Sequence, residues 1–315
     1  MTRLGTGWTL NHVGMVVTDR NATLSYFQQQ GVGVSVGPQP LLPHEAGTGA
    51  LTYYQTLKGD PVTRTYATGG AHNFRDGECQ IGNCQLEVYP MRPGPGMFIS
   101  EYLAAKGPGI NHVCFNTPTI EEDTARLLDR ACPLTFNATV NGRTVENYLD
   151  TRLCGDLMIS LRPPATAFEA LWKQNNEAHP LVPAWRFLGL GIGVDSAEAS
   201  ADYFESLGFA ARAVARQTPD LGVLSSAVSV GPLRLEFHQS LTADSVVQAS
   251  LSRRGEGVSE LAFAVADLDA ETARLEALGT PCIARSRTAD VRYFDTRAQG
   301  NILLRLEAEG DAAAT

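Results

Sequence analysis

The 315-residue sequence has no apolar run near the roughly 20 residues that a membrane-spanning helix needs, and no apolar segment follows Met1. We therefore expect no membrane span and no signal peptide, and we expect a cytoplasmic protein. The six cysteines are too sparse for a disulfide scaffold. Cys79 and Cys84 have no second pair at zinc-finger spacing, so reduced thiols are the simpler interpretation.

Basic residues are also scarce, with 25 Lys and Arg against 34 Asp and Glu, for a net charge of -9. A nucleic-acid partner requires a basic surface, and an anionic membrane favours one, so we expect neither partner. Hydrophobic residues make up 43% of the chain, which is enough for a sizeable core. The length suggests about two domains.

Several motifs occur twice, 145 to 149 residues apart. Tyr148-Leu-Asp-Thr-Arg152 returns as Tyr293-Phe-Asp-Thr-Arg297, and Leu86-Glu87-Val88 returns as Leu235-Glu236-Phe237. Within the first half, Asn11-His12-Val13 returns as Asn111-His112-Val113. The chain therefore reads as two related halves, each containing two related modules.

Each module begins with a strand-like apolar segment and a helical stripe, and alternating strand-like segments follow. These openings are residues 10–17 before 22–30, 110–116 before 120–131, 188–194 before 197–207, and 261–265 before 267–278. Residues 163–183 lack the pattern and contain four prolines. We predict a first domain at 1–165, a linker at 166–184 and a second domain at 185–309.

Three side chains of the first half stand at matching places in this repeat. His12 and His112 lie in the first strands of their modules, and Glu87 lies in the last strand of the first module. Two imidazoles and a carboxylate suit Fe(II), Co, Ni, Zn or Mn, and three protein ligands leave positions open for substrate or water. The alternative is that both histidines are structural.

The segments around these residues resemble the vicinal oxygen chelate superfamily, which includes glyoxalase I, methylmalonyl-CoA epimerase, extradiol dioxygenases and drug-resistance proteins. The matching segments are residues 11–17, 109–115 and 148–152. The resemblance implies an α+β fold of tandem paired βαβββ modules, four modules in two glyoxalase-like domains. It also implies one divalent metal ion on His12, Glu87 and His112.

One position departs from the family pattern, because Ser160 stands where a Glu is usual. In the glyoxalase and epimerase branches that Glu binds the metal and often moves protons. A replacement base is expected in the stretch between the first helix and Glu87, where Glu45 leads the candidates. The others are Tyr53, Tyr54, Tyr66 and His72.

The second half retains fewer of the expected ligands. Gly189 and Glu260 align with His12 and His112, and Arg305 aligns with Ser160. An arginine there would oppose a metal ion and could pair with the carboxylates Glu236 and Glu260 instead. We therefore expect the main catalytic centre in the first half.

The resemblance implies a metal-dependent isomerase or lyase that transfers a proton next to a carbonyl through a metal-stabilised enolate. Its substrate would be a small molecule with adjacent oxygens, and a homodimer is left open. A non-haem Fe(II) dioxygenase is one alternative, because two His and one carboxylate are also its ligands. A small-molecule binding or resistance protein without catalysis is another.

Overall fold

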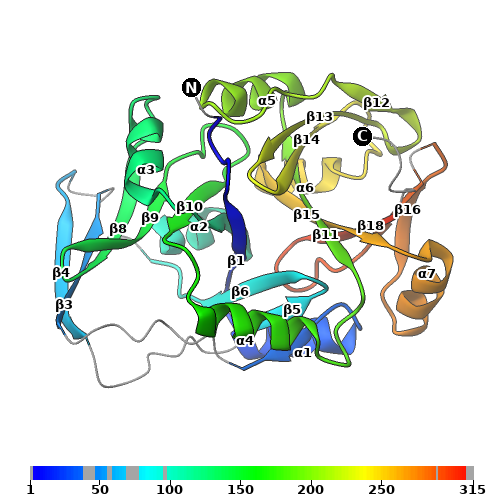
Figure 1. Cartoon of the computed structure of the whole chain (residues 1–315). Helices are drawn as coiled ribbons and strands as arrows, with labels where there is room; N and C mark the ends of the chain where they lie inside the picture. The colour runs from blue at the N-terminus through cyan, green and yellow to red at the C-terminus, as the bar shows by residue number, and fades with distance from the viewer. Residues whose placement is uncertain are drawn as a thin grey trace.

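The computed structural model describes residues 3–37, 47–54, 59–68, 78–94, 98–288 and 290–309. Two curved sheets lie side by side, with helices on their outer surfaces (Figure 1). This arrangement is the predicted α+β fold of tandem paired modules.

The first sheet contains ten strands among the described residues. Their order is β2 (Val34–Val36), β5 (Glu78–Ile81), β6 (Cys84–Pro90), β1 (Thr9–Val17), β7 (Gly109–Asn116), β10 (Met158–Arg162), β9 (Arg143–Leu149), β8 (Leu134–Val140), β3 (Gly47–Tyr53) and β4 (Val62–Thr68). The second sheet contains eight: β12 (Arg216–Thr218), β13 (Val223–Val230), β14 (Leu233–Ser240), β11 (Arg186–Val194), β15 (Gly257–Val265), β18 (Leu303–Ala308), β17 (Val291–Phe294) and β16 (Cys282–Ser286).

The same pairing rule builds all four modules. In each, the first strand runs parallel to the last, as in β1 with β6, β7 with β10, β11 with β14, and β15 with β18. Two modules then join through their antiparallel first strands, β1 with β7 and β11 with β15. This pairing brings the first and last strands of both modules to the centre of each sheet.

Module helices begin where the sequence predicts. These are α1 (Arg20–Gln29), α3 (Ile120–Leu128), α5 (Ala197–Ser206) and α7 (Leu268–Ala277). The side chains of Asp19, Ser196 and Asp267 each accept a hydrogen bond from a backbone N–H of the first turn, which satisfies an otherwise unpaired donor.

Of the other helices, only α4 (Ala167–Glu177), in the linker, was expected, because the sequence there indicates a short helical stretch at residues 168–174. Short helices α2 (Phe98–Lys106) and α6 (Gln248–Arg254) precede the second module of each half, and η1 (Pro219–Leu221) is a single 3-10 turn. Helix α4 lies against the first half: Lys173 donates a hydrogen bond to the backbone oxygen of Asn11 at 2.7 Å. The boundaries at 165 and 185 stay a prediction.

The stretch between α1 and Glu87, which the sequence indicates is loop-rich, contains a hairpin. Strands β3 and β4 pair with each other, and β3 also pairs with β8 of the second module. The hairpin therefore extends the far edge of the first sheet, next to the second module, which follows it in the chain.

The main hydrophobic core is shared by both halves. Trp8 stacks at a ring-centroid distance of 5.3 Å from Phe115 and 5.8 Å from Phe209 of the second half. Its indole nitrogen donates to Asp123 at 2.7 Å, so the buried ring has no unpaired donor. No helix within the described ranges is long and apolar enough to cross a membrane.

Candidate metal centre

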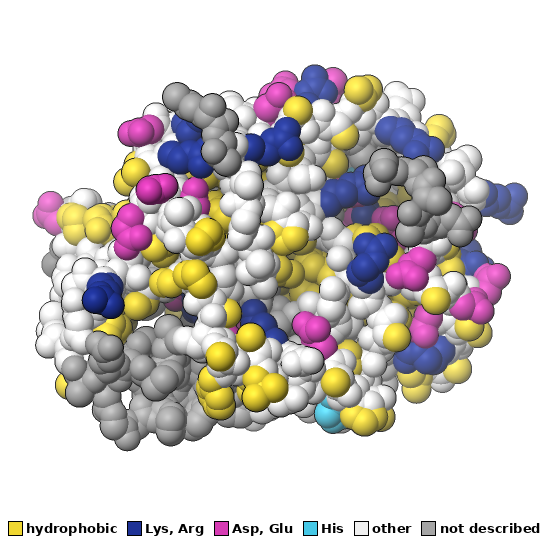
Figure 2. Space-filling model, in the orientation of Figure 1, with side chains coloured by type: hydrophobic (Ala, Val, Ile, Leu, Met, Phe, Trp, Pro, Cys, Tyr) yellow, Lys and Arg dark blue, Asp and Glu magenta, His cyan; other side chains and the backbone are white. Residues whose placement is uncertain are grey.

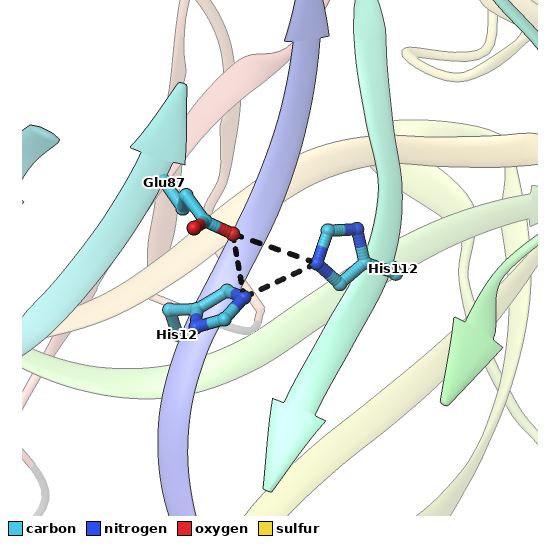
Figure 3. Close-up of side chains that lie close together, drawn as sticks. All are labelled: His12, Glu87 and His112. Atoms are coloured by element: carbon cyan, nitrogen blue, oxygen red, sulfur yellow. Dashed lines mark hydrogen bonds and ion pairs between the residues drawn. The ribbon is translucent and has the colours of Figure 1, made fainter. Parts of the chain in front are cut away.

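Strand register brings three predicted site residues together. Gly14 on β1 pairs with Glu87 on β6 and with His112 on β7, and His12 precedes Gly14 by two residues. Side chains that are cross-strand neighbours, or two apart on one strand, share a face of the sheet. His12, Glu87 and His112 therefore point toward one another (Figure 3).

The three donor atoms lie within metal-ligand range of a common point. His12 Nε2 is 2.8 Å from Glu87 Oε2 and 3.2 Å from His112 Nε2, and His112 Nε2 is 3.9 Å from Glu87 Oε2. A point about 2.0 Å from all three atoms exists for a triangle with these sides, which matches Zn–N and Zn–O distances of roughly 2.0–2.2 Å. The residues present fit a divalent ion.

Burial makes the charge of this group important. His12, His112 and Glu87 are all almost completely inaccessible to solvent. Two neutral imidazoles and one carboxylate carry a charge of -1 away from water, which is costly unless a cation compensates it. A divalent ion would compensate it and leave the centre positive.

An asparagine precedes each histidine and sets its tautomer. The Oδ1 atoms of Asn11 and Asn111 lie 2.7 and 2.9 Å from the Nδ1 atoms of His12 and His112. Since an amide oxygen only accepts, each Nδ1 carries the proton and each Nε2 presents a lone pair to the centre. In each repeated Asn-His pair, the asparagine therefore holds the histidine in the orientation and tautomer that metal binding requires.

Asn11 is itself held by residues from distant parts of the chain. Its Nδ2 donates to Asn116 Oδ1 and to Glu169 Oε1 on α4, both at 2.8 Å. Glu169 thus fixes the side-chain amide of Asn11, which in turn orients His12.

Gly14 provides space for the ring of His112. A Cβ atom at this position would lie 1.7 Å from His112 Cε1 and 2.3 Å from its Nε2. A side chain larger than hydrogen on β1 would therefore displace the imidazole from the centre.

Comparisons with known proteins agree with this fold. The model of the Glyoxalase/Bleomycin resistance protein/Dioxygenase superfamily matches residues 190–294. A variant of 4-hydroxymandelate synthase from Streptomyces coelicolor is similar over 97% of this chain and 94% of that one, with 12% identity and a TM-score of 0.60. The family model thus matches one third of this chain, in its second half, and the whole chain shares its fold with that longer structure.

Shorter structures match part of this chain. Methylmalonyl-CoA epimerase from Mycobacterium tuberculosis is 25% identical, with 41% of this chain and 92% of that one covered and a TM-score of 0.36. A methylmalonyl-CoA epimerase with bound methylmalonyl-CoA is 22% identical, with 41% and 96% covered and a TM-score of 0.36. No curated protein matches by sequence.

Register supports the alignment of Ser160 with the superfamily's fourth ligand position. Glu87 pairs with the residue two after His12, and Ser160 pairs with Cys114, two after His112. Ser160 Oγ lies 3.1 Å from Glu146 Oε1, to which it donates a hydrogen bond. The carboxylate of Glu146, on the neighbouring strand β9, therefore lies beside Ser160. Glu146 also forms an ion pair with Arg162, whose Nη2 is 2.9 Å from Oε1.

Tyr148 is a further residue of the site that sequence reasoning did not select. Its buried hydroxyl lies 3.2 Å from His112 Nε2, and it pairs with Ser160 across β9 and β10. The sequence did offer one indication, because Tyr148 begins the motif that is repeated at Tyr293. The contact, however, depends on a strand pairing that the sequence does not show.

The proposed replacement bases do not gather at these ligands. Glu45 and His72 lie outside the described residues. Tyr53, Tyr54 and Tyr66 lie on or beside the β3–β4 hairpin, and burial raises the pKa of Tyr53 and of Tyr66. In the described part of the chain, none of the three hydrogen-bonds to His12, Glu87 or His112.

The second half of the chain places an arginine at the equivalent centre. Gly191 pairs with Glu236 and Glu260, and Arg305 pairs with the residue two after Glu260. Arg305 Nη1 lies 2.5 Å from Glu236 Oε2, 2.7 Å from Glu260 Oε1 and 3.3 Å from His238 Nε2. The guanidinium thus pairs with the carboxylates, as the sequence suggested.

The surrounding charges favour the ionised form of both carboxylates. Burial alone would raise the pKa of Glu236, but the charges of Arg305, His238 and Arg234 outweigh it and lower the pKa to about 2. The pKa of Glu260 is also lowered, because Arg305 and His238 outweigh its burial. Glu236, His238 and Glu260 are residue types that can bind a metal ion. The positively charged guanidinium of Arg305 already lies among them.

Proposed function

We propose that the protein is a metal-dependent isomerase or lyase that transfers a proton at a carbon next to a carbonyl. The observation that carries the proposal is the convergence of three buried donor atoms, from His12, Glu87 and His112, around one point. The metal would be Fe, Co, Ni, Zn or Mn. The substrate would be a small molecule with adjacent oxygens.

A bound divalent ion would supply Lewis acidity, which makes a carbon next to a coordinated carbonyl easier to deprotonate. Asn11 and Asn111 would keep both imidazoles in the tautomer that binds metal, as their contacts with Nδ1 require. The shared core and the β1–β7 pairing would hold the ligands in place.

Proton transfer requires a second group beside the substrate. Tyr148 presents a hydroxyl 3.2 Å from His112 Nε2, and Glu146 presents a carboxylate beside Ser160. Glu45 remains our candidate from the sequence. The variants Tyr148→Phe, Glu146→Gln and Glu45→Gln test the three candidates. The proton-transfer group is the residue whose variant loses isotope exchange but still binds metal.

The test begins with metal content. Wild-type protein should bind one divalent ion per chain, and His12→Ala and His112→Ala should each abolish stoichiometric binding. A panel of 2-oxo and 2-hydroxy acids and thioesters is then incubated anaerobically in D2O. Deuterium incorporation next to the carbonyl is the expected result, and unchanged metal content in both Ala variants would refute the site.

A second candidate is a non-haem Fe(II) dioxygenase. The specific observation in its favour is the ligand set itself, which consists of two histidines and one carboxylate. Oxygen uptake by the Fe(II)-loaded protein, with oxygen atoms in the product and no anaerobic exchange, would establish this reaction instead.

A further inference from the structure

The second half contains a cavity of about 440 Å³ bordered by β12, β13, β14, β17 and β18. Its volume falls within the range of small-molecule sites, which is roughly 300–1,000 Å³. The Arg305 cluster lies in its wall, so the cavity occupies the side of the second sheet that corresponds to the candidate metal centre of the first.

The charge of the lining differs from that of the whole chain. Three arginines, Arg216, Arg234 and Arg305, line the cavity with two carboxylates, Glu236 and Glu307. Arg305 also pairs with Glu260, which does not line the cavity, so the charges of these six groups sum to zero. The whole chain carries -9. Figure 2 shows both basic and acidic side chains at the end of the molecule that holds β12 and β16.

Ion pairs within the wall leave one arginine available. Glu236 pairs with Arg234 at 2.6 Å and with Arg305, and Glu307 pairs with Arg305 at 2.8 Å. Among the described residues, no carboxylate lies within 4.0 Å of Arg216. Its guanidinium, exposed at the cavity, has the bidentate geometry that suits a carboxylate.

Arg216 also stands beside other polar groups of the cavity. It pairs with Ser225 across β12 and β13, and Ser225 pairs with His238 across β13 and β14, so the three share one face. Ser225 Oγ lies 2.7 Å from His238 Nδ1, and His238 Nε2 lies 2.9 Å from Glu260 Oε1. This polar row crosses one wall of the cavity.

Part of the remaining lining is apolar, beside the hydroxyls of Thr218, Ser226 and Thr288. Leu221, Val223, Val291 and Tyr293 line the cavity and belong to one hydrophobic cluster. A ligand that fits both surfaces would have one anionic end and an apolar body. It would need no metal, because Arg305 already supplies a cation where an ion would bind.

We propose that this cavity binds a small organic carboxylate with an apolar body, through Arg216 and without metal. This function is separate from the proposed reaction of the first half. It gives the second half a binding role in place of catalysis.

The test uses benzoate, phenylacetate and hexanoate as probes, with their amides as neutral controls, in calorimetric titrations of the full chain in EDTA. At least one carboxylate should bind at one site per chain, and its amide should bind at least about tenfold more weakly. Arg216→Gln should weaken binding by a similar factor. Arg186→Gln, an exposed arginine of the same half outside the cavity, should leave it unchanged.

Three results would overturn the proposal. The first is that none of the three carboxylates binds. The second is equal binding by wild type and Arg216→Gln. The third is binding that EDTA or His12→Ala abolishes, which would place the probe at the first-half centre. Failure of the proton-transfer reaction would leave these measurements unaffected, so the two proposals are tested independently.

Discussion

Arg305→Ser is the substitution that most directly tests whether Arg305 takes the place of a cation in the second half. Ser is the residue at the matching position of the first half, Ser160. The change removes the guanidinium but leaves Glu236 and Glu260, which are 6% and 0% exposed. The three candidate ligand residues, Glu236, His238 and Glu260, would then surround a space without a cation.

The expected loss of stability follows from burial and charge. Removing one partner from a buried ion pair costs about 3–5 kcal/mol, because the remaining charge is uncompensated. The lowered pKa of Glu236, about 2 against an ordinary 4.5, corresponds to roughly 3 kcal/mol and agrees with that range. Arg234 also pairs with Glu236 but is 54% exposed, so Arg234→Ser should cost less than about 1 kcal/mol.

Urea denaturation and metal analysis measure both effects. In EDTA, Arg305→Ser should lose about 3–5 kcal/mol of unfolding free energy. With Zn²⁺ or Co²⁺ it should bind one more ion than wild type. An ion at 100 times its dissociation constant should then restore about 2.7 kcal/mol. Wild-type stability in EDTA together with unchanged metal stoichiometry would show that Arg305 does not hold the place of a cation.

Three further predictions concern the two centres. Gly14→Ala should abolish stoichiometric metal binding while circular dichroism stays unchanged, because its Cβ would displace the His112 ring; intact binding would contradict this. Glu169→Ala should weaken metal affinity about tenfold in a chelator competition, since it removes the support of Asn11, whereas exposed Glu177→Ala on the same helix should not. The pKa of Glu236 is lower in the folded state, so its contribution to stability should be complete above about pH 4.5 and lost as the pH falls toward 2. Urea midpoints measured from pH 5 to 2 should therefore fall less steeply for Glu236→Gln than for wild type, and equal slopes would refute the assignment.

The repeat in the sequence was sufficient to predict four related strand–helix–strand modules and the candidate ligands, and the family resemblance added the fold class. Matching motifs imply matching places in equivalent modules, and alternation along a strand implies a shared face. His12, His112 and Glu87 could therefore be grouped before any contact was known. The same alignment placed Ser160 and Arg305 at the fourth position of each half, in agreement with the strand register.

Only the tertiary structure decided which residues surround those ligands. Glu169 reaches Asn11 from 158 positions away, and the hydroxyl of Tyr148 reaches His112 across strands whose order is not local information. Strand β3 of the β3–β4 hairpin likewise pairs with β8, which lies in the second module, much later in the chain. Sequence periodicity specifies the face that a side chain occupies. The neighbours on that face depend on sheet order and register, which are set by the packing of the whole chain.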